Sequence, residues 1–359
     1  MSQKTTVWSL LFLAIIAMSG IGLADALSAA PIKNNWLVVD FDGTCTVRDT
    51  ITMLPRLASL AQSRLPPIKS DKVTLSPDAV IDFQGRLSIF SMLEDEYFRK
   101  YTEAMESMKP GDANESDETT MLEELAKSID KLDDVSTAIT HEVSNWRVLG
   151  GLGDLSKTEM LQLIDVYKEK QMALEPKTIK DRETNYDELL GCLSLKEDCL
   201  SVLRNCAESQ DYGIGVLSIN WCPLLIESLL VHPLCESSES EALSDDIAIW
   251  SNSVNAEGIV ALPFPGAIAK REKILEIQNS GREDDSFRVV YVGDSSTDLL
   301  AIIQADVGIL LGGSQSATTL AKQYGVAVKP LSEFDDENSQ RIVWTANNWQ
   351  EIGSFLDER

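Results

Sequence analysis

Histidine is scarce in this sequence of 359 residues, which contains only His141 and His232. Zinc sites built from several histidines are therefore excluded, and we expect any general acid or base to be a carboxylate. Positive charge is also in short supply, since 31 Lys and Arg face 57 Asp and Glu and the formal net charge is −26. Nucleic-acid binders hold phosphates with clustered Lys and Arg, so this balance argues against a nucleic-acid partner.

Cysteine occurs six times but never in the paired CxxC pattern of a zinc site. Cys192, Cys199 and Cys206 lie seven residues apart, which would align them along one face if that stretch were helical. They are interpreted as small core-facing residues, with disulfides or a thiol site as the alternatives. The connectivity of any disulfide cannot be deduced from the sequence.

Long apolar runs are missing except near the N-terminus, where uncharged and mostly apolar residues extend from Val7 to Ala24. Ala24-Asp25-Ala26 has the small-x-small form of a signal-peptidase site. Residues 1–26 are therefore predicted to be a signal peptide, which implies the secretory pathway or the extracellular space. An uncleaved membrane anchor and an organelle address are the alternatives, and membrane contact is expected only if the segment is uncleaved. The rest of the chain is expected to be soluble.

Short apolar runs alternate with helix-favouring stretches through the second half of the chain. The runs cover residues 36–40, 212–218, 288–294, 305–311 and 325–328, and the helical stretches include 268–277 and 317–324. Near-continuous apolar strands alternating with helices indicate an α/β fold with a doubly wound parallel sheet. One or two further strands are expected within residues 247–262.

A long helix-favouring block separates the first two predicted strands. Leu122, Leu125, Ile129 and Leu132 recur there at helical spacing. We interpret residues 51–210 as a helical cap inserted after the first strand, with residues 33–50 and 211–359 forming the α/β core. The acidic stretch 111–118 inside the cap is expected to be a solvated loop.

Polar residues follow the first two predicted strands. Asp40 and Asp42 are separated by one residue, so an extended chain can direct both side chains to one site. Gly43 permits a tight turn there, so that backbone N–H groups at Gly43 and Thr44 can approach an anion. The second strand is followed by Ser218 and Asn220, a hydroxyl and an amide suited to phosphate oxygens.

The third polar cluster follows the predicted strand at 288–294. Asp294 and Asp298 are four residues apart, which is about one helical turn. Lys270 and Lys273 precede that strand on a predicted helix. Ligands of such sheets bind beyond the carboxyl ends of the strands, so these clusters predict one common site.

Together these clusters resemble the four motifs of the haloacid dehalogenase superfamily of phosphohydrolases. The matching residues are Asp40 to Thr44, Ser218, Lys270 and Gly293 to Asp298. The flanking residues 41–46, 216–222 and 291–309 further resemble the phosphatase half of the plant bifunctional thiamine-salvage proteins, which is a thiamine monophosphate phosphatase. The resemblance therefore implies a Rossmann-like core and a phosphomonoester hydrolase.

The resemblance also implies catalytic roles. Asp40 would attack phosphorus to give an aspartyl-phosphate, and Asp42 would protonate the leaving alkoxide and then deprotonate water. Lys270 would neutralise charge on Asp40 and the phosphoryl group, with Lys273 as the alternative. Gly43, Thr44, Ser218 and Asn220 would bind the phosphate.

The cofactor implied by the resemblance is Mg²⁺. It would be held by Asp40, the carbonyl of Asp42 and Asp294, with Asp298 orienting Lys270 or a metal-bound water. The acid at Asp42 favours a phosphatase over a dehalogenase, because a halide leaves without a proton.

The size of the expected cap indicates a small phosphorylated metabolite as substrate, with thiamine monophosphate as the first candidate. Pyridoxal phosphate, phosphoethanolamine and nucleotides are the alternative substrates. A catalytically silent protein that uses the same fold for binding is the alternative from another class. The oligomeric state is left open.

Overall fold

The computed structural model describes residues 35–64, 83–108, 118–173, 192–209, 211–236, 247–281, 286–335 and 341–358. The predicted leader at 1–26 and nearly all of the acidic stretch at 111–118 lie outside these residues. Within the described ranges, every helix is too short or too polar to cross a membrane.

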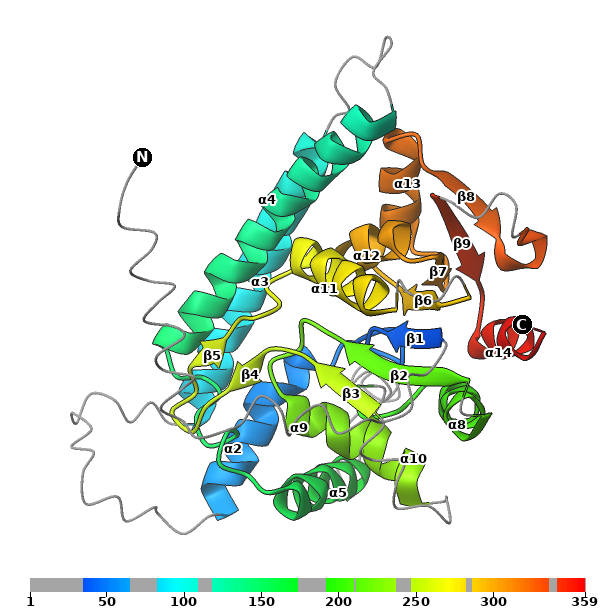
Figure 1. The fold of residues 1–359 in the computed structure, drawn as a ribbon. Helices are drawn as coiled ribbons and strands as arrows, with labels where there is room; N and C mark the ends of the chain where they lie inside the picture. Colours follow the sequence, from blue (N-terminus) through cyan, green and yellow to red (C-terminus); the bar gives the residue numbers. More distant parts are fainter. Residues whose placement is uncertain are drawn as a thin grey trace, which may run out of the picture. The chain divides into compact units, whose positions relative to one another are not determined.

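A parallel sheet forms the centre of the fold (Figure 1). The described residues contribute seven strands to it, in the order β3-β2-β1-β6-β7-β9-β8, and every pair is parallel. In that order the strands are Ile247–Trp250, Tyr212–Leu217, Asn35–Val39, Arg288–Gly293, Val307–Leu311, Ile342–Ala346 and Ala327–Pro330. The strand order reverses direction between β1 and β6, where ligands bind in open α/β sheets.

Helices cover both faces of the sheet. One face packs against α11 (Ala267–Ser280), α12 (Leu299–Gln304) and α13 (Gln315–Gln323). The other packs against α8 (Cys199–Ser209), the consecutive helices α9 (Pro223–Ile226), η4 (Glu227–Val231) and α10 (His232–Glu236), and α14 (Trp349–Asp357). Successive residues of β1 alternate between these two cores, because strand side chains point to opposite faces. The predicted doubly wound parallel sheet is confirmed.

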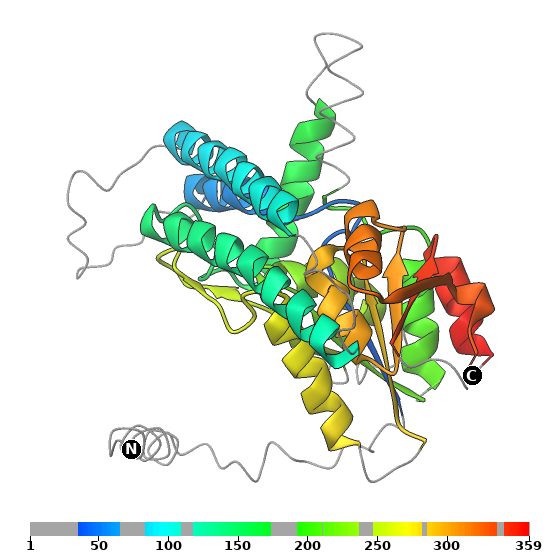
Figure 2. The same cartoon turned by 90° about the horizontal axis from the view of Figure 1, so that it is seen from above.

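The segment after the first strand is helical, as predicted. It contains η1 (Ile51–Met53), α2 (Leu54–Arg64), α3 (Phe83–Ser107), α4 (Glu118–Asn145) and α5 (Lys157–Ala173). The long helices α3 and α4 pack side by side (Figures 1 and 2). Leu125, Ile129 and Leu132 of α4 are buried, as their spacing indicates. The division into core and cap at residues 51 and 210 stays a prediction; α8 lies inside the cap range yet packs against β2.

Three features differ from the sequence-based expectations. The strand β9 and the helix α14 were not predicted. In the structure β9 lies inside the sheet and pairs with both β7 and β8. Residues 247–262 supply β3 to the sheet, and a separate antiparallel pair forms from β4 (Ser253–Val254) and β5 (Val260–Ala261). Cys192 lies before α8, so only Cys199 and Cys206 share a helix, although all three side chains are buried.

Candidate active site

Three neighbouring strands bring the predicted residues to one edge of the sheet. Val39 at the end of β1 is in register with Val216 of β2 and Val292 of β6. Asp40, Ser218 and Asp294 therefore leave the sheet at the same edge. The backbone N–H of Asp40 donates a 2.8 Å hydrogen bond to the carbonyl of Val292, which extends the pairing by one residue.

Lys270 connects two of the carboxylates. Its Nζ lies 2.8 Å from Oδ1 of Asp40 and 2.7 Å from Oδ1 of Asp298, and all three side chains are buried. Burial alone would lower the pKa of Lys270, but the carboxylates of Asp298 and Asp40 outweigh it and raise that pKa. Lys273 lies elsewhere, with its Nζ 2.8 Å from Glu276 and over the ring of Trp250. The geometry favours Lys270 as the site lysine.

Asp298 is held by a set of donors. Its Oδ1 accepts hydrogen bonds from Lys270 and from the hydroxyl of Tyr291, the latter at 2.7 Å. Its Oδ2 accepts from the hydroxyl and backbone N–H of Ser295 at 2.7 and 3.1 Å. Burial would raise the pKa of Asp298, but Lys270 and these hydrogen bonds lower it below its ordinary value. Asp298 is therefore a fixed negative charge that positions Lys270.

Asp42 is bound by a different group of residues. Its Oδ1 accepts from the backbone N–H and hydroxyl of Thr50 at 2.8 and 2.6 Å, and its Oδ2 accepts from the amide of Asn220 at 2.9 Å. Burial raises the pKa of Asp42, and the hydrogen bonds from Thr50 and Asn220 oppose that shift. A raised pKa suits a carboxyl that must carry a proton during part of a catalytic cycle.

The position of Asn220 corrects its predicted role. Its Nδ2 donates to Asp42 and, at 2.8 Å, to Thr50, and its Oδ1 accepts from the N–H of Cys222. Both amide hydrogens are therefore used inside the protein, an arrangement that favours a role in orienting Asp42 over the predicted phosphate role. Ser218 is fully buried, and its Oγ accepts a hydrogen bond from the backbone N–H of Asn220. The hydroxyl hydrogen of Ser218 takes no part in this bond.

The turn after Asp42 requires glycine. Gly43 has φ +72°, and a Cβ there would lie 2.4 Å from Oδ2 of Asp294. Its N–H donates to Oγ1 of Thr46 at 3.1 Å, so this N–H is not directed at a ligand as predicted. The hydroxyl of Thr44 donates to Oδ1 of Asp294 at 3.0 Å, which places Thr44 as a support for that carboxylate.

Two further contacts to this turn were not predicted. Lys196 donates from Nζ to the carbonyl of Gly43, and the indole N–H of Trp349 donates to the carbonyl of Thr44 at 3.0 Å. Both residues come from parts of the chain that lack any motif. Sequence spacing gives no signal for such contacts, because they depend on how distant segments pack.

The carboxylates of Asp40, Asp294 and Asp298 fit a divalent cation. One oxygen of each lies within 4.8 Å of the others. Burial raises the pKa of Asp294 to about 6, with Asp298 adding to the shift, and burial raises the pKa of Asp40 well above its ordinary value. These carboxylates repel one another, and a hard divalent cation bound by their oxygens would offset that repulsion. Both oxygens of Asp298 accept short hydrogen bonds, Oδ1 from Lys270 and Oδ2 from Ser295, whereas Lys270 bonds only Oδ1 of Asp40, so Asp40 and Asp294 are the better ligands.

No family model matches this sequence. The chain is 24% identical over 337 residues to the "Bifunctional TH2 protein, mitochondrial" of Arabidopsis thaliana, covering 88% of this chain and 48% of that protein. It is 24% identical over 144 residues to a CTO1 family protein of Schizosaccharomyces pombe, covering 37% of this chain and 53% of that one. The chain thus spans about half the length of these curated relatives.

Solved structures give looser matches. A phosphoserine phosphatase in the form of a phospho-aspartyl intermediate analogue is 15% identical, with a TM-score of 0.40, covering 90% of this chain and 98% of that one. Cytosolic 5'-nucleotidase IIIB bound to cytidine is 12% identical, with a TM-score of 0.44, covering 91% and 87%. Superpositions this loose carry nothing about the substrate.

Proposed function

We propose that this chain, which has the fold of the haloacid dehalogenase superfamily phosphatases and is a distant homologue of the Arabidopsis TH2 protein, is a Mg²⁺-dependent phosphomonoester hydrolase. The observation that carries the proposal is the buried bridge from Asp40 through Lys270 to Asp298, with Asp294 beside it. Burying two carboxylates and one ammonium beside a third, half-buried carboxylate is costly for stability, so such a cluster favours a catalytic role.

In the proposed reaction a carboxylate oxygen of Asp40 attacks the phosphorus of the ester. The P–O bond to the alcohol breaks, and Asp42 donates its proton to the leaving oxygen. Water, deprotonated by Asp42, then attacks phosphorus, releases phosphate and restores the Asp40 carboxylate. Lys270 holds Asp40 in place and offsets negative charge that builds up on the phosphoryl oxygens.

The metal and the hydroxyl donors complete the proposed site. Bound Mg²⁺ supplies charge neutralisation for the phosphoryl group, and Asp40, Asp294 and the carbonyl of Asp42 would hold it. Ser218 donates its hydroxyl hydrogen to a phosphoryl oxygen. Thr50 and Asn220 keep the carboxyl of Asp42 directed toward the leaving group.

Thiamine monophosphate is the substrate we propose first, because the residues flanking Asp42, Ser218 and Asp294 resemble the thiamine-salvage phosphatases. Pyridoxal phosphate, phosphoethanolamine and nucleotides are the other candidates. A silent binding protein is disfavoured, because a scaffold does not need the costly buried charges of Asp40 and Lys270.

The test is phosphate release from these esters by the purified chain with Mg²⁺ and with a chelator. We expect Mg²⁺-dependent release that is lost in Asp40→Asn. We also expect substrate labelled with ³²P to leave a hydroxylamine-sensitive label on the wild-type chain and none on Asp40→Asn. Turnover that survives in Asp40→Asn would refute the assignment of the nucleophile, and no release from any ester would refute the proposed function.

A further inference from the structure

A pocket of about 120 Å³ adjoins the proposed catalytic acid. Its walls come from the helices α3 and α4 and from the loops that follow β1 and β2. Asp49 and Ile51 line it on either side of Thr50, and Ile219 and Trp221 line it on either side of Asn220. Thr50 and Asn220 both bind the carboxyl of Asp42, and Asp49 of the lining interacts electrostatically with Asp42, so the pocket lies next to the proposed catalytic acid.

Aromatic side chains make up much of the pocket wall. Phe90, Tyr97 and Phe98 come from α3, and Trp221 comes from the loop after β2. The ring centroids of Tyr97 and Phe98 are 5.5 Å apart. The phenol of Tyr97 is mostly buried, which raises its pKa, so it stays uncharged at neutral pH. Flat, apolar groups and cations are the ligands that such walls favour.

The charged residues of this pocket are acidic. Asp49 and Glu94 line it, and they are near enough to interact electrostatically. Among the described lining residues there is no lysine or arginine. Arg56 lies near Glu94 and donates to the hydroxyl of Tyr167, but it is not part of the lining. Burial raises the pKa of Asp49 to about 8, so at neutral pH a ligand in the pocket meets the carboxylate of Glu94 and the aromatic faces.

We infer that this pocket holds the leaving group, that it accepts aromatic leaving groups which are cationic or neutral, and that Glu94 rejects anionic ones. The inference rests on the proposed phosphatase activity and adds to it a rule for the charge of the substrate. At a separation of about 6 Å in a partly exposed site, Glu94 repels an anion and attracts a cation by roughly 1.4 kcal/mol each, and together these correspond to about 100-fold in kcat/KM between the anionic and the cationic ester.

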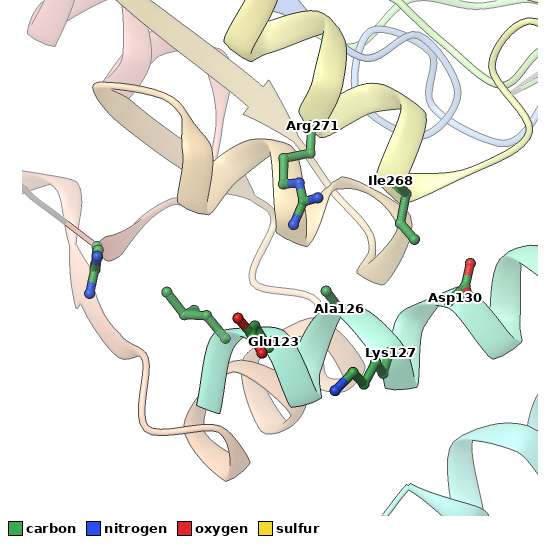
Figure 3. Close-up of a pocket in the computed structure, with 8 residues that line it drawn as sticks. Glu123, Ala126, Lys127, Asp130, Ile268 and Arg271 are labelled. Carbon is green, nitrogen blue, oxygen red and sulfur yellow. The ribbon is translucent and has the colours of Figure 1, made fainter. Parts of the chain in front are cut away.

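A larger hollow elsewhere does not share this character. It has a volume of about 370 Å³ and lies between α4 and α11 (Figure 3). Lys127 and Arg271 face it together with Glu123 and Asp130, so its charges are mixed. None of its described lining residues belongs to the loops that carry Asp40, Asp42 or Ser218. The leaving group is therefore assigned to the smaller pocket.

The test uses three benzyl phosphates that carry an aminomethyl, a methyl or a carboxylate group at the para position. A methylene separates the ring from the ester oxygen, so the three alcohols leave with similar ease. We expect the wild-type chain with Mg²⁺ to hydrolyse the cationic ester about 100-fold better than the anionic one, by kcat/KM. The neutral ester should fall between them.

Substitutions at Glu94 test the residue assignment. We expect Glu94→Gln to remove most of the preference for cation over anion, and Glu94→Lys to reverse it. The rate of each Glu94 variant with the neutral ester is the reference to which its rates with the two charged esters are normalised. The matched control is Glu96→Gln on the same helix, because Glu96 pairs with Arg99 and Lys100 and does not line the pocket. Its preference should equal that of wild type.

The possible failures are distinguishable. If no ester releases phosphate, the proposed function fails. If release depends on Asp40 but the anionic ester is hydrolysed as well as the cationic one, the phosphatase proposal stands and the charge rule is overturned. If the preference is present but Glu94→Lys leaves it unchanged, Glu94 is not the selecting residue.

Discussion

Oδ1 of Asp133 in α4 accepts a 3.1 Å hydrogen bond from the backbone N–H of Ala267, the first residue of α11. Its Oδ2 accepts from the N–H of Ile268 at 3.2 Å. These N–H groups have no partner within their own helix. A residue of the helical segment after β1 thus caps the helix that presents Lys270. A Cβ on Gly266 would lie 2.0 Å from the Asp133 carboxyl, so the contact also requires glycine there.

The capping carboxyl makes stability depend on pH. Burial raises the pKa of Asp133 from 3.8 to about 6. The folded state therefore binds this proton more tightly than the unfolded state, and the stabilisation is complete below pH 3.8 and is lost as pH rises through about 6. We expect the unfolding free energy of wild type, relative to Asp133→Asn, to fall by up to about 3 kcal/mol between pH 4 and 7.

Urea unfolding of both proteins across that range measures the difference. Asp134→Asn is the matched control, because Asp134 is the exposed neighbour on the same helix. Its unfolding free energy should parallel that of wild type at each pH. A constant difference between wild type and Asp133→Asn would contradict the raised pKa.

Loss of the Lys270 ammonium should damage both stability and turnover. Lys270→Met leaves the buried carboxylates of Asp40 and Asp298 without their partner, which we expect to cost about 3–5 kcal/mol of unfolding free energy. Lys273→Met removes a surface ion pair and a cation–π contact, and about 1 kcal/mol is expected. Chemical denaturation and phosphate release give the two readouts.

Lys270→Arg separates the two effects, since it retains the charge but not the shape of the ammonium. We expect it to fold and to lose most of kcat. If Lys273→Met abolished turnover while Lys270→Arg retained it, the motif lysine would be Lys273.

The loss of activity on replacing Asp42, the proposed acid, should depend on the leaving group. We expect Asp42→Asn to lower kcat for an alkyl phosphate by about 10²–10⁴. The loss should be much smaller for formation of the phosphoenzyme from 4-nitrophenyl phosphate, because nitrophenolate leaves without a proton. Rapid-quench measurement of nitrophenolate release tests this, and equal losses for both esters would argue against an acid role for Asp42.

Metal affinity should depend on Asp294. Asp294→Asn is expected to weaken Mg²⁺ binding by about 10–100-fold, measured by calorimetry as well as by the Mg²⁺ dependence of turnover. Asp306→Asn is the control, since Asp306 is similarly half-buried but accepts from Val289 at the start of β6, the opposite end of that strand. An unchanged affinity in Asp294→Asn would place the ion elsewhere.

The site residues that directly follow β-strands could be predicted from the sequence. Asp40, Ser218 and Asp294 follow short apolar runs, and parallel strands present their carboxyl ends at one edge, so their convergence could be predicted without coordinates. The predicted fold class is confirmed for the same reason. Leu37 and Val39 pack into one core and Val38 into the other, as expected for an apolar strand buried on both faces.

Residues that act through tertiary contact could not be predicted. Thr50 and Asn220 lie 170 residues apart in the sequence, and both donate hydrogen bonds to Asp42. Tyr291 lies within the apolar strand β6, and its hydroxyl donates a hydrogen bond to Asp298. Spacing suggested a phosphate role for Asn220 because its amide looked available. Only the packed structure reveals that both of its hydrogens are used.

The central placement of β1 has a consequence for synthesis. Its two hydrogen-bonded neighbours are β2 and β6, which the ribosome makes only after the entire helical segment and, for β6, after most of the chain. Both edges of β1 are therefore unpaired until β2 is made, and one edge stays unpaired until β6 is made, a condition that favours misassembly and slow folding. We expect nascent chains that end before Arg288 to depend on chaperones, because such a fragment lacks β6, one of the two strands that pair with β1.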